Sequence, residues 1–498
     1  MMHHIQSAGF RYPACLLSVL FCLLTLPASG QEITGIISGT VTDPSDAVVP
    51  GAAVKLTLDA TGESKNASTE GNGTFAFLNV LPGQYTLSIS AQGFKGLEKK
   101  NINLTSSERM ALGRIALQLG ASTESVTVVA QGAAVQTESS ERSAVITSTQ
   151  MSDLSSLTRA WTTYLLTIPS VYADGGDGSS PSIAGQPASS NTIIMDGIGG
   201  DGENGGPRFR ANLDTIAELH VIEANPPAEY GNHPGAVINI VTKSGTRDFH
   251  GTGCYYIRNE ALNANNFFNN RVGTIRPRYR YNDYCASLDG PILIPGKLSR
   301  DKLFFFGSYE NIQNQAPSGN RNYTMPTQLE RSGDFSQSLT VGNALIPITD
   351  PTTHAPFPGN VVPANRIDPN MQKYISLFPL PNFATPANRL LSNGNYNYIF
   401  SEVQPNPYHK WSAKVDWLVN SKLQVMVENS AWNQITGGYS VGAGFAAWGE
   451  IQGGYARGAK GDPAGRIIYT FSPTMTNEFL WGGHYYYEGV WNLSLIHI

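Results

Sequence analysis

Hydrophobic and polar positions alternate with a period of two along most of this chain, which predicts strands. From residue 31 to about 119, short alternating runs are separated by turn signals at the spacing of a small β-sandwich. The strands predicted in this part are residues 35–41, 53–58, 74–78, 85–89 and 112–119.

The middle of the chain predicts a second, mixed unit. Residues 191–198 and 235–246 are rich in β-branched residues between glycines and read as buried strands, the first cut by an Asp196-Gly197 turn signal. Apolar spacing over 151–157 and 161–168 is compatible with short helices that end at a proline. The middle part is therefore predicted to be a small α+β unit.

After Gly251 the pattern changes to runs of about ten residues with alternate apolar positions, the signature of transmembrane strands. In one such run the two faces separate clearly, with an outward set toward lipid and an inward set toward a lumen. The outward set is Trp411, Val415 and Trp417, and the inward set is Lys410, Lys414 and Asp416. The seven predicted strands are residues 250–258, 282–293, 302–313, 409–419, 422–434, 464–471 and 476–488.

A soluble β-sandwich is the alternative, and the connection lengths decide against it. The links between the seven strands alternate long and short from the first to the last. Bacterial barrels keep short periplasmic turns and long outer loops, whereas a sandwich has no reason to alternate.

Composition agrees with this β-rich interpretation. Only 14% of residues are charged, and the chain has 51 Gly, 22 Tyr and 20 Phe. The net charge of −5 with mixed signs offers no basic stripe, which argues against a nucleic-acid partner.

Three motifs in order carry a family resemblance. The turn at residues 196–198, the step at 229–231 and the ending at 235–246 together resemble the plug domain of TonB-dependent outer-membrane receptors, and residues 249–251 follow as in the Oar-like branch. Residues 31–119 are similar to the carboxypeptidase-regulatory-like domain. The segments 325–327, 331–335 and 358–363 are each similar to the large external loop of Oar-like receptors.

The resemblance, with the strand pattern, predicts a mainly β fold. It comprises an N-terminal β-sandwich of transthyretin or Ig type, an α+β plug and a partial antiparallel transmembrane β-barrel. The expected division is a signal peptide at 1–30, the sandwich at 31–119, a TonB-box-like segment with the plug at 120–246, and barrel strands at 247–498.

The start of the chain has the pattern of a secretory signal peptide. Arg11 precedes an apolar run that is too short to span a membrane, and small residues favour cleavage before Gln31. Two cysteines remain beyond it, Cys254 and Cys285. A single bridge between them is the alternative in an oxidising periplasm, but we expect free thiols because the predicted strand offsets do not place them opposite each other.

An enzyme hypothesis finds little support. His220 and Glu223 form a His-x-x-Glu motif, but on a strand side chains three apart point to opposite faces, so they could not close on one zinc ion. No other catalytic or phosphate-binding motif occurs, and we predict no catalytic residue, no metal and no cofactor.

The segment between sandwich and plug is a candidate for energy coupling. Its position resembles a TonB box, and an unpaired extended strand can recruit a partner by strand addition. The alternative is a linker strand or the first strand of the plug. The candidate residues are Glu124, Ser125, Val126, Thr127, Val128, Val129 and Ala130.

The leading function is a TonB-dependent transporter or receptor in the outer membrane, with its N-terminal domain in the periplasm. Expected partners are TonB with its inner-membrane motor proteins, outer-membrane lipid and an unidentified extracellular ligand. The alternative is a surface adhesin or structural protein without energy-coupled transport. Candidate ligand contacts in the apical plug loops are Asp201, Glu203, Asn204, Arg208 and Arg210.

Seven strands are an odd number, whereas single-chain bacterial barrels close with an even number and plugged transporters use about 22. We therefore expect an incomplete barrel, seen as a partial curved sheet around the plug. Within it, the strand at 422–434 should pair with its neighbour through a tight turn at Asn420 and Ser421.

Overall fold

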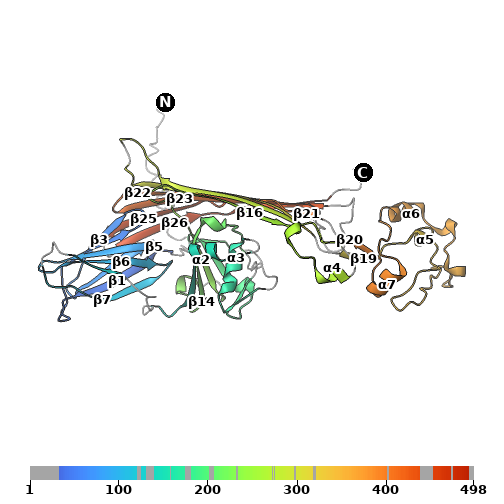
Figure 1. Cartoon of the computed structure of the whole chain (residues 1–498), viewed down its shortest axis with the longest axis horizontal. Helices are drawn as coiled ribbons and strands as arrows, with labels where there is room; N and C mark the ends of the chain where they lie inside the picture. The colour runs from blue at the N-terminus through green and yellow to red at the C-terminus, as the bar shows by residue number, and fades with distance from the viewer. Residues whose placement is uncertain are drawn as a thin grey trace, which may run out of the picture.

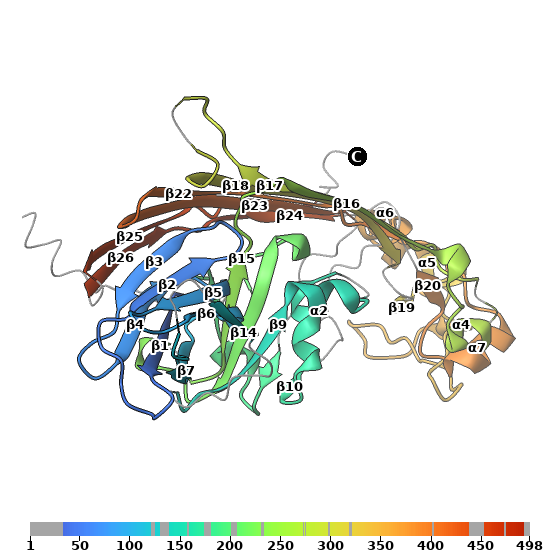
Figure 2. The same cartoon turned by 60° about the vertical axis from the view of Figure 1, so that its left-hand side comes forward.

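The structure, a computed structural model, has three parts that contact one another and a smaller loop subdomain at one end. A sandwich domain and a central domain lie side by side under one long curved sheet, and a loop subdomain extends from the far end of that sheet (Figures 1 and 2). The described residues are 33–492 apart from 121–124, 130–138, 157–158, 174–180, 201–206, 231–233, 272, 274, 297–298, 318–320, 401–402, 438–452 and 473–474.

The sandwich domain has two facing sheets. One has the order β4-β1-β7 and the other the order β3-β2-β5-β6-β8. Ile37, Phe75 and Leu87 are among the buried residues between them, and they come from both sheets. The strands are β1 (Gly35–Thr42), β2 (Ala53–Leu58), β3 (Ser64–Ser68), β4 (Thr74–Val80), β5 (Gly83–Ser90), β6 (Gly96–Leu104), β7 (Arg109–Ala116) and β8 (Ser125–Val129).

The central domain is built on a five-stranded sheet in the order β13-β12-β15-β14-β9. Every residue of β12 and β15 is buried, as predicted for these two runs. Asp196 and Gly197 both have positive φ angles of 47° and 89°, so the Asp-Gly pair forms the tight turn between β12 and β13. The strands are β9 (Arg142–Thr147), β12 (Thr192–Met195), β13 (Ile198–Gly199), β14 (Ile216–Ala224) and β15 (Val237–Thr242), with a small pair β10 (Val171–Tyr172) and β11 (Ser182–Ile183).

Short helices cover this sheet. The helix α2 begins after Thr147, whose side chain and that of Gln150 form a capping box. The helical elements are α2 (Ser148–Asp153), α3 (Trp161–Tyr164), η1 (Leu165–Thr167), η2 (Ala188–Ser190), η3 (Leu213–Thr215) and η4 (Ala228–Tyr230), which agrees with the predicted helical spacing.

Within the described residues, the curved sheet contains seven spans in antiparallel order. The last two spans are each interrupted once at the same level, by Asp462-Pro463 and by Gly483-His484. Each of these spans therefore consists of two strands. The elements are β16 (His250–Asn259), β17 (Arg280–Pro291), β18 (Leu303–Pro317), β22 (Tyr408–Asn420), β23 (Leu423–Gly437), β24 (Gly453–Gly461) with β25 (Ala464–Ser472), and β26 (Met475–Gly482) with β27 (Tyr485–Asn492).

The predicted pairing across Asn420 is confirmed. β22 pairs with β23, and the Asn420 side-chain oxygen accepts hydrogen bonds from the backbone N–H groups of Lys422 and Leu423 at 2.8 and 3.0 Å. Among the described residues the sheet is open, with β16 at one edge and the β26–β27 span at the other.

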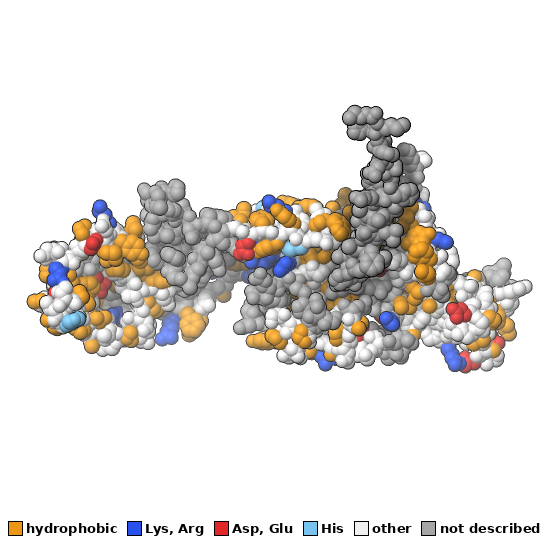
Figure 3. Space-filling view, turned by 180° about the vertical axis from the view of Figure 1, so that it is seen from behind, with side chains coloured by type: hydrophobic (Ala, Val, Ile, Leu, Met, Phe, Trp, Pro, Cys, Tyr) orange, Lys and Arg blue, Asp and Glu red, His pale blue; other side chains and the backbone are white. Residues whose placement is uncertain are grey.

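The two faces of the sheet separate by polarity, as predicted. Trp411, Val415 and Trp417 are 40%, 36% and 42% exposed on the outer face, while Lys410 and Lys414 are buried on the inner face. Seen from behind, hydrophobic side chains gather along the sheet and on the loop subdomain (Figure 3). Among the described residues, no helix has the length and apolar character to cross a bilayer.

The two cysteines correct one prediction. Cys254 on β16 pairs directly with Cys285 on β17, and the two form a disulfide with a Cα–Cα distance of 5.0 Å. The prediction was wrong because the hairpin register is set by its loop: the Glu260 carboxylate accepts hydrogen bonds from the Tyr279 backbone N–H and the Arg280 guanidinium. That contact aligns residue 259 with residue 280.

The long connection between β18 and β22 forms a subdomain of its own at the far end of the sheet (Figure 1). Asn360 connects three of its segments. The Asn360 side-chain amide donates to the carbonyls of Phe335 and Ile346 and accepts from the N–H of Ile348. Its elements are β19 (Arg321–Tyr323), α5 (Gln328–Arg331), η6 (Pro358–Asn360), η7 (Ala364–Arg366), α6 (Pro369–Ser376), α7 (Pro386–Ser392), β20 (Tyr398–Phe400) and β21 (Val403–Pro405); the β16–β17 loop holds η5 (Glu260–Leu262) and α4 (Phe267–Arg271).

Candidate functional site

The central domain meets the inner face of the sheet through buried charges. Lys414 of β22 extends toward the β12–β13 turn, where its Nζ lies 3.7 Å from an Asp196 carboxylate oxygen and 3.0 Å from the Thr242 hydroxyl. Arg466 of β25 donates to the Asp196 carbonyl at 2.7 Å. Burial acts to raise the pKa of Asp196, but Lys414 and Arg466 outweigh it, so that pKa lies below its ordinary value.

Two carboxylates of the sheet complete this network. Glu428 of β23 lies 3.9 Å from the Lys414 ammonium, and Glu478 of β26 lies 3.0 Å from the Arg466 guanidinium. All of these side chains project from the inner faces of their strands, because alternate residues of a strand point to the same side.

A second buried network joins the central domain to the first two spans. The Arg159 guanidinium lies 2.9 Å from Asp214 of the same domain and 3.1 Å from Asp283 of β17. Its carbon is 4.1 Å from the centre of the Tyr256 ring on β16. Arg159 has φ 51°, a left-handed conformation that costs of order 1 kcal/mol in a residue other than glycine and that these contacts offset.

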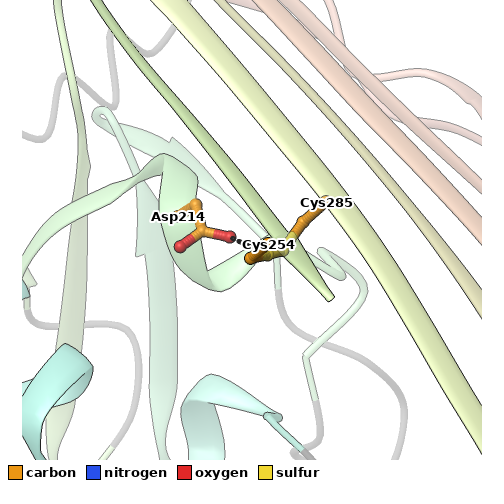
Figure 4. A group of neighbouring side chains, drawn as sticks. All are labelled: Asp214, Cys254 and Cys285. Atoms are coloured by element: carbon orange, nitrogen blue, oxygen red, sulfur yellow. Dashed lines mark hydrogen bonds between the residues drawn. A yellow bond between two sulfur atoms is a disulfide. The ribbon is translucent and has the colours of Figure 1, made fainter. Parts of the chain in front are cut away.

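Asp214 also lies beside the disulfide, with a carboxylate oxygen 3.9 Å from the Cys254 sulfur (Figure 4). Within the described chain, Asp214, Cys254 and Cys285 are the group of potential metal-binding side chains close enough to share an ion. The disulfide occupies both sulfurs, and metal coordination by cysteine requires free thiolates.

The connection from the central domain into the sheet is tight. A side chain at Gly245 would place its first carbon 2.4 Å from the Phe305 carbonyl oxygen of β18, so only glycine fits where the chain crosses this strand. This requirement gives a physical reason for the glycine in the motif that ends the central domain.

At the end of the sheet that carries the long loops, the central-domain segment around Arg208 and Arg210 contacts strands β22 and β23. The Trp432 indole donates to the Arg208 carbonyl at 3.2 Å, and the Arg210 guanidinium lies 5.0 Å from the Trp432 ring and 5.6 Å from the Tyr408 ring. Arg208 is exposed and Arg210 half-buried. Of the other predicted contacts, Asp201, Glu203 and Asn204 lie outside the described residues.

Next to this segment, Phe209 packs on the interrupted spans. Its ring meets that of His484 edge-on at 5.8 Å, and the His484 imidazole is hydrogen bonded to the Asp462 carboxylate. The two strand interruptions therefore supply the side chains that receive Phe209.

The sandwich domain is joined to the central domain by the turn between β6 and β7. The Ser106 backbone N–H donates to the Glu218 carboxylate at 2.7 Å, and the Asn239 side chain donates to the Ser106 hydroxyl at 2.6 Å. Burial raises the pKa of Glu218 to about 7, with a further contribution from Glu108, while the Ser106 N–H opposes the rise.

This junction borders a cavity of ≈ 610 Å³ where all three parts meet. Glu63 lines it from the sandwich, Lys243 from the central domain and Trp417 from the sheet. The sandwich thus touches the sheet at its short-turn end, where the Glu63 and Gln424 side chains are hydrogen bonded and Thr34 donates to Glu478 at 3.4 Å.

The candidate coupling segment lies on the sandwich domain. Its described part, β8, pairs in parallel with residues 96–100 of β6 and makes no strand pairing with the central domain within the described chain. Glu124 and Ala130 lie outside the described residues.

The His-x-x-Glu motif has two separate environments. His220 and Glu223 both lie on β14, where His220 is 3.8 Å from Glu141 and Glu223 pairs with Arg142. Burial lowers the pKa of His220 and Glu141 opposes this. Their side chains thus have different partners, as predicted for a strand.

A curved sheet with an apolar outer face, covered on its inner face by a domain held through buried charges, defines an outer-membrane β-barrel protein. The chain belongs to the outer membrane beta barrel domain family, which it matches over residues 241–493. Residues 36–118 match the carboxypeptidase regulatory-like domain, which confirms the resemblance of the sandwich. These matches place the protein in the outer membrane, as predicted.

Known relatives agree with this family. The chain is 26% identical over 295 residues to the TonB-dependent transporter Oar of Myxococcus xanthus, covering 55% of this chain and 26% of that protein. The matched region thus spans about a quarter of the length of this relative.

Solved structures with a similar arrangement include the outer membrane transporter YddB from Escherichia coli, with a TM-score of 0.42 and 11% identity over 66% of this chain and 37% of that one. The siderophore receptor PirA from Acinetobacter baumannii gives a TM-score of 0.34 and 11% identity over 66% and 39% of the two chains.

Proposed function

We propose that this protein is a TonB-dependent transporter of the outer membrane, in which the central domain is the plug of the barrel. The observation that carries the proposal is the polar character of the contact between the two. Lys414, Arg466 and Asp196 hold the central domain to the inner face of the sheet through buried ion pairs and hydrogen bonds.

A plug must seal the barrel at rest and leave its position during transport. Exposing an apolar interface to water costs about 25 cal/mol per Å², because the hydration of apolar surface is unfavourable. Separated charges regain hydration, and a buried ion pair contributes little net stability against its own desolvation. A contact built from ion pairs is therefore suited to closing firmly and opening at moderate cost.

The outer side offers the ligand site of this proposal. Arg208 and Arg210 lie at the long-loop end of the central domain, and the loop subdomain stands at the same end of the sheet. A ligand that binds this segment would contact residues that are themselves hydrogen bonded to Trp432 of β23. The chemistry of the ligand is left open by these contacts.

The periplasmic side would supply the energy. The segment 124–130 is our candidate for the strand that TonB captures, with TonB driven in turn by its inner-membrane motor proteins. An adhesin with the same fold would need neither TonB nor the proton motive force.

The test replaces residues 124–130 by a Gly-Ser sequence of equal length in the full chain. Uptake of the ligand identified by a growth screen of a deletion strain should stop, and surface binding of that ligand should persist. The control replaces residues 44–48, an exposed loop of the sandwich, by a Gly-Ser sequence in the same way. Uptake that survives removal of the proton motive force would refute the transporter, and unchanged uptake in the first variant would refute the assignment of residues 124–130 as the coupling strand.

A further inference from the structure

The sandwich domain contacts both of its neighbours, each through a different part of its surface. Its β6–β7 turn reaches the central domain, whereas its β2–β3 turn reaches the curved sheet and β4 lies beside β26 (Figure 2). A domain that is connected to two others in this way can control how firmly those two are held together.

The contact with the central domain is buried. The β6–β7 turn is held in shape by Glu108, whose carboxylate accepts from the Thr105 N–H and from the Thr105 hydroxyl, both at 2.8 Å. Ser106 in this turn is fully buried, and its bonds to Glu218 and Asn239 are 2.7 and 2.6 Å long.

The next residue of the turn extends this buried contact. The Ser107 hydroxyl is 2.8 Å from the Tyr230 hydroxyl, and Tyr230 packs in a buried cluster with Ile194, Ile222 and Val237 of the central domain. The turn is thus inserted among core residues. Separating the two domains would leave buried polar groups without partners, which costs more than breaking an exposed hydrogen bond.

The contact with the curved sheet is more exposed. Glu63 and Gln424, which are hydrogen bonded to each other, are both half-buried. The bond from the Thr34 hydroxyl to Glu478 is long, at 3.4 Å. When half-buried groups such as Glu63 and Gln424 separate, water replaces the lost partner, so their bond contributes only modestly to stability.

We propose that the sandwich domain is a clamp, which retains the central domain against the curved sheet at rest and leaves the sheet together with the central domain when that contact opens. This inference rests on the proposed role of the central domain as a plug. The ion pairs between the central domain and the sheet contribute little net stability, so a second connection through the sandwich changes how often the plug is released. The exposed contact opens while the buried contact persists, so the two domains move as one body.

Cysteine reporters in the full-length protein in lipid vesicles test the order of opening. T215C reports on the contact between the central domain and the sheet, where the Thr215 hydroxyl is 2.8 Å from that of Ser308. T34C reports on the contact between sandwich and sheet, and S106C on that between sandwich and central domain. Each variant meets a thiol reagent in urea below the global unfolding transition, where labelling follows the population of the open contact. The wild-type protein, with its two cysteines in a disulfide, is the control.

The clamp predicts that T34C and T215C are labelled at similar rates and that S106C is labelled about tenfold more slowly or less. Labelling of S106C as fast as T215C would overturn the proposal, because the sandwich would then stay on the sheet. Labelling of T215C while T34C remains protected has the same meaning.

Retention of the plug is tested by removing one bond of the clamp. E63A should raise the labelling rates of T34C and T215C by about three- to tenfold and leave that of S106C unchanged. Q424A removes the same bond from the sheet, so equal effects of the two variants exclude a folding defect in either domain. E70A, which removes an exposed carboxylate of the sandwich, is the matched control and should change none of these rates.

Failure of the proposed function gives a different result. If T215C stays protected until the whole protein unfolds, the central domain is not a separable plug, and the proposed function and this inference fall together. If T215C is labelled but E63A and Q424A leave its rate unchanged, the plug stands and the clamp is wrong.

Discussion

At the scale of single residues, the buried charges at the domain contacts define how this protein is held together. The sequence predicted that Lys410, Lys414 and Asp416 face inward, because they alternate with aromatic and aliphatic residues on β22. The central-domain partners of Lys414 could not be predicted, since the periodicity of a strand does not tell how one domain packs against another. Ser106 and Glu218 escaped notice for the same reason.

Glu218 should make the contact between sandwich and central domain sensitive to pH. Its pKa is raised to about 7 in the folded protein against an ordinary value of 4.5, so the folded state prefers the protonated form. The contact is therefore strongest below pH 4.5 and loses on the order of 3 kcal/mol as the pH rises through 7. Hydrogen exchange at Ser106, corrected for the intrinsic rate, should show less protection at pH 8 than at pH 5.

The variant E218Q keeps an oxygen that can accept from the Ser106 N–H and removes the titration. Its protection at Ser106 should be the same at both pH values. E223Q serves as the control on the same strand, because the pKa of Glu223 is lowered by Ser170 and Arg142 in spite of its burial. A wild-type contact that is equally protected at pH 5 and pH 8 would contradict the assignment.

At the scale of elements, most strands were predictable to within a few residues, and the exceptions have physical reasons. The sixth span begins at Gly453 with β24 rather than at residue 464, because the Gly-rich sequence of β24 lacks an apolar alternation and was assigned to the preceding loop. The strands β3 and β6 of the sandwich were missed because they carry many exposed polar residues and lack a clear apolar alternation. The pairing of Cys254 with Cys285 was mispredicted because the register of their hairpin depends on Glu260 in the loop. The two-residue periodicity of strands gives no information on hydrogen bonds formed by such loop residues.

The contact between β22 and the β12–β13 turn should depend on charge balance. K414M removes the cation between Asp196 and Glu428 and leaves buried anions, which should lower the free energy of unfolding by about 3–5 kcal/mol. Adding D196N should recover part of the loss, because one of the two stranded anions is then neutral. Urea unfolding of the full chain in lipid vesicles measures both effects.

K422M is the matched control, since Lys422 lies exposed at the β22–β23 turn, and its effect should stay within about 0.5 kcal/mol. Equal losses for K414M alone and for the double variant would show that Lys414 acts through packing of its stem rather than through its charge.

At the scale of the whole molecule, the alternation of connection lengths was the most informative feature of the sequence. It decided in favour of a membrane barrel over a soluble β-sandwich, and the match to the outer membrane beta barrel domain family agrees. The location of the sandwich beside the central domain and under the short turns could not be predicted, because it depends on single contacts such as those of Glu63 and Thr34.

The outer face of the sheet should meet lipid. V415R places a charge on this face in the middle part of β22, which should cost about 2–4 kcal/mol on insertion into a bilayer. S421R puts the same side chain in the short turn near the membrane surface, where the cost should be about 0–1 kcal/mol. Folding yields of the two variants in lipid vesicles give the comparison, and equal yields would mean that Val415 does not face the membrane core.

The loop subdomain has a consequence for how this surface can change over generations. Its fold relies on a few polar side chains that bond to main-chain atoms, above all Asn360 with three such bonds and Arg331 with the carbonyls of Phe378 and Pro379. Main-chain atoms are the same whichever residue bears them. The residues between these anchors can therefore be exchanged with little effect on the shape of the subdomain, so selection by hosts, phages or rival microbes can diversify the exposed surface while the spans beneath it stay unaltered.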